Sequence, residues 1–315
     1  MKLITNWTED NCRKYGKEVM SVEHALNDSG LFTDEALAAM IDAHPNHLID
    51  VLAVPNGHEY QDYKDQQLTV DFRGADGKTL VAAAKAGDIW INVREVMNTQ
   101  PAYMALLDQL HRELESNAGK NKDRRNCRGG ILISSPTART PYHSDPTMTH
   151  LWHIRGHKRA YVYPMNQNYL PDSAFEAIVL GEASEDVPYK PEFDDAAVIA
   201  DLHGGEMISW PHRSPHRVEN VSFCVSMVME FSTQESAFIN AGMLTNGILR
   251  RRYGRNPSWE QASLFERVCK SLSGRILQKL GAQKAYKRTD LVKFKLDPNA
   301  QGFLQMVKTP YHRVF

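Results

Sequence analysis

The stretch from Gly130 to Asp145 reads GILISSPTARTPYHSD. Its apolar beginning, residues 130–135, predicts a buried strand. His143 and Asp145 follow and are two residues apart, so on an extended strand both side chains leave the same face. An imidazole and a carboxylate on one face can hold a single metal ion, and this pair is the feature from which the rest of the chain is interpreted.

The His-x-Asp pattern is a weak signal by itself. A chain of 315 residues with 13 His and 38 acidic residues contains about 1.6 His-x-Asp/Glu matches by chance. This chain contains two. The second, His111-Arg112-Glu113, lies in a helical pattern, where side chains two residues apart point in different directions. With a third ligand from elsewhere, His143 and Asp145 would complete the two-histidine, one-carboxylate set of non-haem iron(II) oxygenases.

Composition is typical of a globular protein and excludes several classes. Apolar residues make up 42% and charged residues 24% of the chain, and the net charge is −1, so we expect no bulk attraction to nucleic acid or to an anionic membrane. No apolar run approaches the roughly 20 residues of a membrane span, and we do not expect the first residues, which lack a long apolar core, to act as a signal peptide. Four widely spaced cysteines predict a reduced, cytoplasmic protein.

The order of predicted elements divides the chain into two parts. Helices are predicted near Thr33 and from Pro101 to Ser116, with mostly short strands between residues 130 and 232. We therefore predict one domain over residues 1–232, which the family resemblance described below identifies as an oxygenase domain with its core at about 130–232. Residues 233–315 are predicted to form a C-terminal helical segment, whose second helix begins in a capping box at Ser258.

The third metal ligand should come from a later strand. His212 and His216 both lie in the stretch WPHRSPHRVEN, residues 210–220, and spacing alone does not choose between them.

The run from residue 140 to 164 resembles the core of the JmjC, or cupin-like, iron(II)- and 2-oxoglutarate-dependent oxygenases. It is most similar to the hydroxylase branch that includes the asparaginyl hydroxylase of hypoxia-inducible factor. Four features match in order: a hydroxyl residue three before the metal histidine, the His-x-Asp pair, a Gly-x-Lys-Arg turn before a strand that ends in proline, and a distal histidine before an apolar–acid pair. In this chain they are Thr140, His143 with Asp145, residues 156–159 with Pro164, and His216 with residues 218–219.

The resemblance covers about residues 130–232 and implies both a fold and a site. The fold would be mainly β with helices: a double-stranded β-helix (jelly-roll, cupin/JmjC type) core with N-terminal helical elaboration and C-terminal helices. His143, Asp145 and His216 would bind Fe(II). Thr140 and Lys158, which is 13 residues past Asp145, would bind 2-oxoglutarate, and O2 would take the last position. Four further residues are expected to line the pocket: Tyr142, Thr149, Trp152 and His212. Thr149 stands where many of these hydroxylases have asparagine, which leaves the substrate pocket less well defined than the metal site.

The implied reaction is hydroxylation of a C–H bond in a protein side chain or a small molecule, with release of succinate and CO2. Two alternatives stay open: demethylation of an N-methyl group by the same chemistry, and a catalytically silent JmjC-like regulatory or binding protein. In related hydroxylases C-terminal helices often form a dimer interface. Leu264, Phe265 and Val268 could form a homodimer contact, or they could pack on the chain's own barrel.

Overall fold

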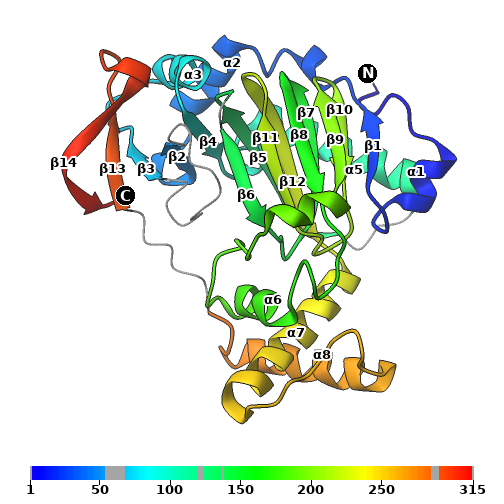
Figure 1. Cartoon of the computed structure of the whole chain (residues 1–315). Helices are drawn as coiled ribbons and strands as arrows, with labels where there is room; N and C mark the ends of the chain where they lie inside the picture. Colours follow the sequence, from blue (N-terminus) through cyan, green and yellow to red (C-terminus); the bar gives the residue numbers. More distant parts are fainter. Residues whose placement is uncertain (1, 54–67, 120–123, 137, 285–290, 314–315) are drawn as a thin grey trace.

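The computed structural model describes residues 2–53, 68–119, 124–136, 138–284 and 291–313. Two β-sheets face each other in a double-stranded β-helix, as predicted (Figure 1). The small sheet has four strands in the order β6 (Arg139–His143), β11 (His216–Asn220), β8 (His157–Val162) and β9 (Val198–His203). The large sheet has ten strands, in the order β1 (Met20–Glu23), β10 (Glu206–Ser209), β7 (Met148–Arg155), β12 (Cys224–Ser232), β5 (Arg125–Ser134), β4 (Ile89–Val93), β2 (Ile49–Ala53), β3 (Leu68–Asp71), β13 (Leu291–Leu296) and β14 (Leu304–His312).

Each face of the large sheet has its own apolar cluster. On β7, Trp152 and Ile154 belong to the cluster shared with the covering helices, whereas Leu151 packs with Ala160 and Val162 of the small sheet. Alternate residues of a strand point to opposite faces. Thr149, Leu151 and His153 of β7 therefore face the space between the two sheets, which we call the barrel interior.

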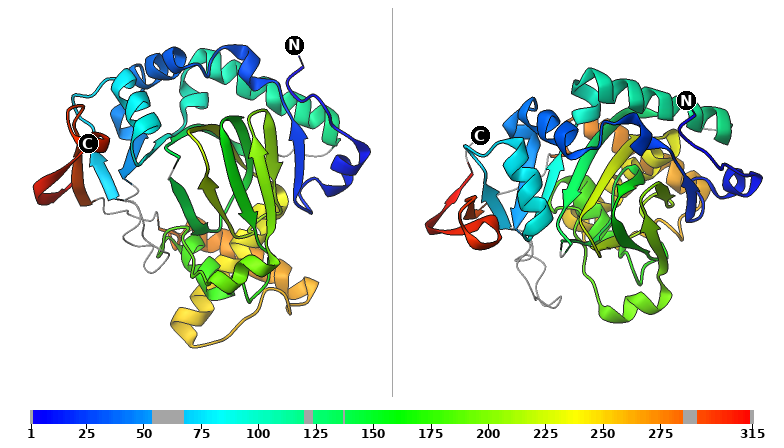
Figure 2. Two further views of the ribbon diagram at one scale, coloured as in Figure 1. Left: turned by 45° about the horizontal axis from the view of Figure 1, so that its top comes forward. Right: turned by 90° about the horizontal axis from the view of Figure 1, so that it is seen from above.

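Helices cover the outer face of the large sheet and close one end of the barrel. The covering helices are α2 (Asp34–Asp42), α3 (Gly77–Ala86), α4 (Val96–Thr99) and α5 (Pro101–Ala118), and α1 (Glu9–Lys14) lies near the N-terminus. The sequence offers Thr33 or Asp34 as the cap of α2, and in the structure Thr33 caps it by accepting from the backbone N–H of Ala36. A second group of helices, α6 (Asp172–Leu180), α7 (Gln234–Tyr253) and α8 (Leu264–Lys279), lies together below the sheets in Figure 1 and in the left view of Figure 2.

The predicted C-terminal helical segment, residues 233–315, is helical only in its first part. After α7 and α8, residues 291–312 form the β13–β14 hairpin, and β13 pairs with β3 in parallel. In β13 apolar residues do alternate with lysines from Val292 to Leu296, which is a strand pattern that the prediction missed. β14 is largely exposed and gives a weaker signal. A domain boundary at residue 232 stays a prediction.

The start of α8 also differs from the prediction. Ser263, not Ser258, is the N-cap of this helix. Trp259 is buried in the cluster beneath α7, and its backbone N–H donates to the Asp172 side chain. These contacts hold the residues just after Ser258 in a non-helical conformation. Farther along α8, Gly274 allows close packing, because a β-carbon there would lie 1.9 Å from the carbonyl oxygen of Ala241 in α7.

The four cysteines are all free thiols. Within the part of the chain that the structure describes, no helix is both long and apolar enough to cross a membrane.

Buried imidazoles predict a loss of stability in acid. Burial, together with the nearby positive charge of Arg124, lowers the pKa of His150 to about 3 and that of His111 to about 4. An unfolded histidine takes up a proton near pH 6.5, so between pH 6.5 and 4 the unfolded state binds more protons than the folded state. We expect the free energy of unfolding to fall over this range by on the order of 2 kcal/mol per imidazole.

The measurement is denaturant unfolding at pH 7.5 and 5.5. Replacing His150 with Leu should reduce the difference between the two pH values, whereas replacing the exposed His47 with Gln should leave it unchanged. An equally large pH effect in the His150→Leu variant would show that this imidazole is not the cause.

Candidate metal centre

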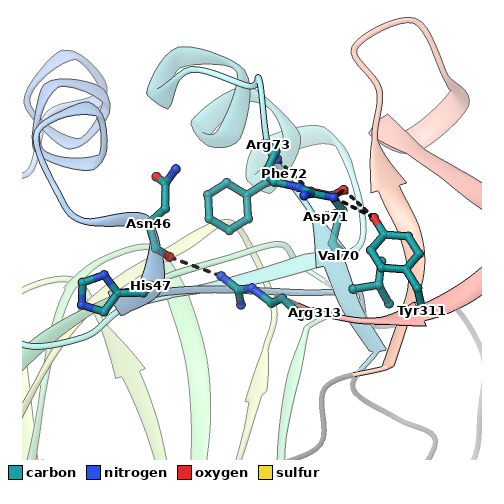
Figure 3. A pocket seen from close by; sticks show the side chains of 9 residues that line it. Asn46, His47, Val70, Asp71, Phe72, Arg73, Tyr311 and Arg313 are labelled. Atoms are coloured by element: carbon teal, nitrogen blue, oxygen red, sulfur yellow. Dashed lines mark hydrogen bonds and ion pairs between the residues drawn. The ribbon is translucent and has the colours of Figure 1, made fainter. Parts of the chain in front are cut away.

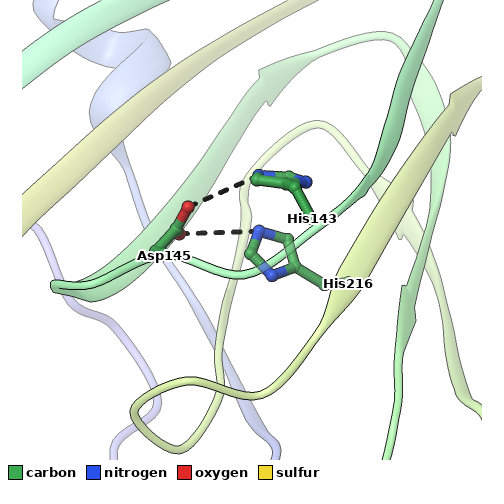
Figure 4. A group of neighbouring side chains, drawn as sticks. All are labelled: His143, Asp145 and His216. Carbon is green, nitrogen blue, oxygen red and sulfur yellow. Dashed lines mark ion pairs between the residues drawn. The ribbon is translucent and has the colours of Figure 1, made fainter. Parts of the chain in front are cut away.

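Three side chains meet at one end of the small sheet (Figure 4). His143 ends β6 and is paired directly with His216, the first residue of β11, while Asp145 lies just beyond β6. Oδ1 of Asp145 is 3.4 Å from Nε2 of His143, and Oδ2 is 3.5 Å from Nε2 of His216. The three ligand atoms all lie within 4.8 Å of one another, so one ion can contact all of them.

Hydrogen bonds aim both imidazoles at this centre. Nδ1 of His143 lies 2.8 Å from the carbonyl oxygen of Pro141, and Nδ1 of His216 lies 3.1 Å from that of Ser214. A carbonyl oxygen can only accept, so each Nδ1 carries the proton and each Nε2 presents its lone pair toward Asp145. Metal-binding histidines commonly have this arrangement.

The electrostatics also suit a cation. Burial would raise the pKa of Asp145, but His216, His143 and the Thr149 hydroxyl hold it below its usual value, so the carboxylate is ionised. Burial and the neighbouring His143 lower the pKa of His216 to about 4, which keeps it neutral. For His143, burial favours the neutral form but the charge of Asp145 outweighs it and raises the pKa. The raised pKa means that Asp145 favours a proton on Nε2 of His143, and a divalent ion bound there would replace that proton.

The loop that carries Asp145 is held from several sides. Thr149 Oγ1 donates to Asp145 Oδ2 at 2.6 Å, and Ser144 Oγ donates to the carbonyl of Arg213 at 2.9 Å. Asn240 of α7 donates to the carbonyl of Pro146 at 2.7 Å. Thr149, predicted to line the pocket, therefore contacts the carboxylate itself. Asn240 could not be identified from the sequence, because its partner is 94 residues away.

The structure distinguishes between His216 and His212 as the candidate third ligand. His212 is close enough to Asp145 to sense its charge, but its Nε2 lies 3.2 Å from the carbonyl of Pro146, and it is outside the group of converging ligand atoms. Burial lowers its pKa to about 3. His216 is thus the histidine whose position fits a third ligand.

Lys158 lies in the barrel interior on β8, four residues before Val162, the residue that is paired with His216. It is only 3% exposed, and it is paired with Asn220 on β11 and Leu202 on β9. Its position is fixed by the β7–β8 hairpin at Gly156, whose φ of +94° favours glycine. Burial lowers the pKa of Lys158, and no carboxylate of the described residues forms an ion pair with its ammonium group. A buried cation without an anion is costly unless a ligand supplies one.

Other polar groups share the barrel interior with Lys158. Thr140 on β6 is paired with Val218, an interior residue, so the two side chains leave the same face. Oδ1 of Asn220 is buried and has no hydrogen-bond partner among the residues described. His153 Nδ1 lies 3.1 Å from the Ser226 hydroxyl. Strand alternation would have identified these residues once the pairing of the strands was known.

Two of the predicted pocket residues lie elsewhere. Trp152 is on the outer face of the large sheet, in the cluster with the covering helices. Tyr142 packs among aromatic residues between the small sheet and α6–α7, where its hydroxyl donates to the carbonyl of Tyr169. Both side chains are therefore core residues and do not line the barrel interior.

Two glutamates near the triad were not predicted. The side chain of Glu185 is largely exposed, but its carboxyl group is crowded by protein atoms and close to Asp145, and both effects raise its pKa to about 8. Burial and Asp145 also raise the pKa of Glu230, which forms a 3.3 Å ion pair with Arg128. The surroundings of Asp145 are thus rich in acidic groups, which favours a bound cation.

A cavity of about 230 Å³ lies away from this centre, between β2, β3 and the C-terminal hairpin (Figure 3). Its charged groups already have partners: Asp71 accepts from Arg73 and Tyr311, and Arg313 donates to the carbonyl of Ile49 at 2.7 Å. These contacts fasten the hairpin to the sheet, and we assign the cavity no further role. It is lined by Asn46, His47, Val70, Asp71, Phe72, Arg73, Val292, Tyr311 and Arg313.

Comparison with known proteins supports the fold. No protein-family model matches the chain, and no curated protein matches it by sequence. Among solved structures, an X-ray structure of E. coli YcfD is similar at a TM-score of 0.51 and 16% identity, covering 91% of this chain and 71% of that one. Another, of YcfD described as a ribosomal oxygenase from Escherichia coli in complex with cobalt and succinic acid, has a TM-score of 0.48 at 15% identity, covering 89% and 68%. The narrower resemblance to the asparaginyl hydroxylase stays a prediction, and the chain shares the fold of YcfD.

Proposed function

We propose that this protein is an iron(II)- and 2-oxoglutarate-dependent dioxygenase that hydroxylates a C–H bond of a protein side chain or a small molecule. The observation that carries the proposal is the convergence of Nε2 of His143, Nε2 of His216 and the carboxylate of Asp145, each held in a ligand orientation. Two imidazoles and one carboxylate with open positions are typical of non-haem iron(II) oxygenases.

The residues present fit both groups that the reaction requires. Iron(II) is six-coordinate, so three protein ligands leave three positions, enough for a bidentate 2-oxoglutarate and for O2. When bound, iron and 2-oxoglutarate supply the oxidising chemistry, with succinate and CO2 as products. The chain supplies the position of these groups: Thr149 holds the Asp145 carboxylate, and two backbone carbonyls hold the imidazoles.

Lys158 is the residue that would bind the distal carboxylate of 2-oxoglutarate. Its ammonium group is buried in the barrel interior, where an ion pair is screened less than in water. The carboxylate would also relieve the cost of burying the cation. Thr140, on the interior face of β6, would add a neutral hydrogen bond.

The proposal is tested by incubating purified protein with iron(II), ascorbate and 2-oxoglutarate. We expect production of succinate and, when cell lysate is added as a source of substrate, a product heavier by one oxygen atom in mass spectra. Formaldehyde release would instead indicate N-methyl demethylation. No iron binding and no succinate would indicate a silent, regulatory protein and would contradict the proposal.

A homodimer through α8 is a further expectation. The helix exposes a row of apolar side chains, including Phe265 at 80%, Leu272 at 56% and Ile276 at 60% exposure. An exposed apolar row of this kind is typical of a protein–protein contact. We expect a dimer in light scattering after size-exclusion chromatography, and a monomer after Leu272→Glu with Ile276→Glu. The control is Ser273→Glu, which adds a charge at an exposed polar position of the same helix; a monomeric wild-type protein would contradict the prediction.

A further inference from the structure

A second cluster of metal-binding side chains lies on the opposite face of the small sheet from the barrel interior. His157 on β8 and His203 on β9 are paired directly across the ladder, and Asp201 is two residues before His203 on the same strand. Lys158, which follows His157 on β8, and Leu202, which lies between Asp201 and His203 on β9, both point into the barrel. His157, Asp201 and His203 therefore project outward together, and we call them the outer triad.

The geometry of the outer triad is compact. Nε2 of His157 is 2.7 Å from Oδ1 of Asp201. The rings of His157 and His203 are stacked, with centroids 4.5 Å apart and an interplanar angle of 12°. One ligand atom from each of the three residues lies within 4.8 Å of the others. The side chains are accessible to an ion from solvent, because that of Asp201 is 52% exposed and that of His157 is 27% exposed.

The backbone under the outer triad is well held. The backbone N–H of His157 donates to the Ser222 hydroxyl at 2.9 Å, and its carbonyl accepts from the N–H of Val221 at 2.9 Å. The N–H of His203 donates to Glu206 at 2.6 Å. A site on paired strands with fixed ends loses little freedom when an ion binds, so its three ligands are already arranged for coordination.

We propose that the outer triad is a second metal site, which binds a borderline divalent transition-metal ion such as Zn²⁺. Imidazole nitrogen and carboxylate oxygen are ligands that Zn²⁺ accepts, and three protein ligands leave one position for water. The ion would be coordinated from two neighbouring strands, and β9 is one of the two edge strands of the small sheet (Figure 1). Metal binding therefore fastens this edge to β8, the strand that carries Lys158.

One neighbouring residue competes with the ion. Nε of Arg159 lies 3.2 Å from the same carboxylate oxygen of Asp201, and the Arg159 side chain is 50% exposed. An ion would have to displace this guanidinium and bind close to its positive charge. Replacing Arg159 with Ala is therefore expected to strengthen Zn²⁺ binding at the outer triad, a result that a loss of structure could not produce.

The experiment measures Zn²⁺ bound per chain by equilibrium dialysis and elemental analysis, on the full-length protein. We expect two ions in the wild type, one in His203→Ala or Asp201→Asn, and one in His143→Ala, which retains the outer triad. His47→Ala is the matched control, since it removes an exposed histidine outside the cluster and should leave two ions bound. Circular dichroism checks that each variant is folded.

Hydrogen exchange provides a second measurement. Zn²⁺ should slow exchange of the β9 amides in the wild-type protein and in His143→Ala, but not in His203→Ala. A wild-type protein that binds no Zn²⁺, or one whose Zn²⁺ count is unchanged in His203→Ala, would overturn the proposal. The inference is independent of the proposed oxygenase activity, because each triad is removed by its own variant and neither readout uses turnover.

Discussion

Replacing Asp145 or His143 with Ala is expected to abolish 2-oxoglutarate turnover together with iron binding. Asp145 is the charged member of the triad, and its two oxygens face the two imidazoles at 3.4 and 3.5 Å. Removing a group that only supports a ligand already costs about 10–100-fold in metal affinity. Loss of a ligand itself should cost more than about 100-fold. The measurement is iron(II) titration of each variant, with succinate production assayed in parallel.

His212 provides the matched control for the third ligand. It is also a buried histidine near Asp145, but its Nε2 faces the carbonyl of Pro146 instead of the centre. His212→Gln should therefore retain iron, whereas His216→Gln should lose it. The opposite pattern would show that His212 is the ligand and that the arrangement of the triad differs when iron is bound.

Replacing Lys158 with Met is expected to weaken 2-oxoglutarate binding and to stabilise the protein without co-substrate. Truncating one partner of a buried charge pair costs about 2–5 kcal/mol, which is roughly 30-fold or more in the KM for 2-oxoglutarate. The stability effect has the opposite sign because the ammonium group is buried without an anion, and an apolar side chain of similar length removes that cost.

The two measurements are 2-oxoglutarate kinetics and denaturant unfolding of the same variant. Iron affinity should not change, since Lys158 is not a ligand. Lys78→Met, on the exposed surface of α3, is the control and should alter neither quantity. A Lys158→Met protein that is less stable and has an unchanged KM would show that this lysine is a structural residue.

The sequence alone was sufficient to predict the features that depend on residues close together in the chain. A cap at Thr33 or Asp34 could be expected because a side-chain oxygen and a backbone N–H three residues on meet within one turn, and Thr33 is the residue that forms it. The spacing of His143 and Asp145 predicted a shared site, and the resemblance of residues 130–232 to the JmjC oxygenases predicted the barrel. Each of these inferences uses contacts between residues that are close in sequence or a pattern that covers a whole motif.

Other features depended on which strands pair, and only the tertiary structure decided them. His216 differs from His212 because β11 begins opposite His143. Trp152 is a core residue because its side chain lies on the face of β7 that packs against the covering helices. The outer triad joins residues 44 to 46 positions apart through one strand pair, and neither strand alone shows it. Spacing along a chain determines which side chains share a face, but the register between strands determines which of them meet.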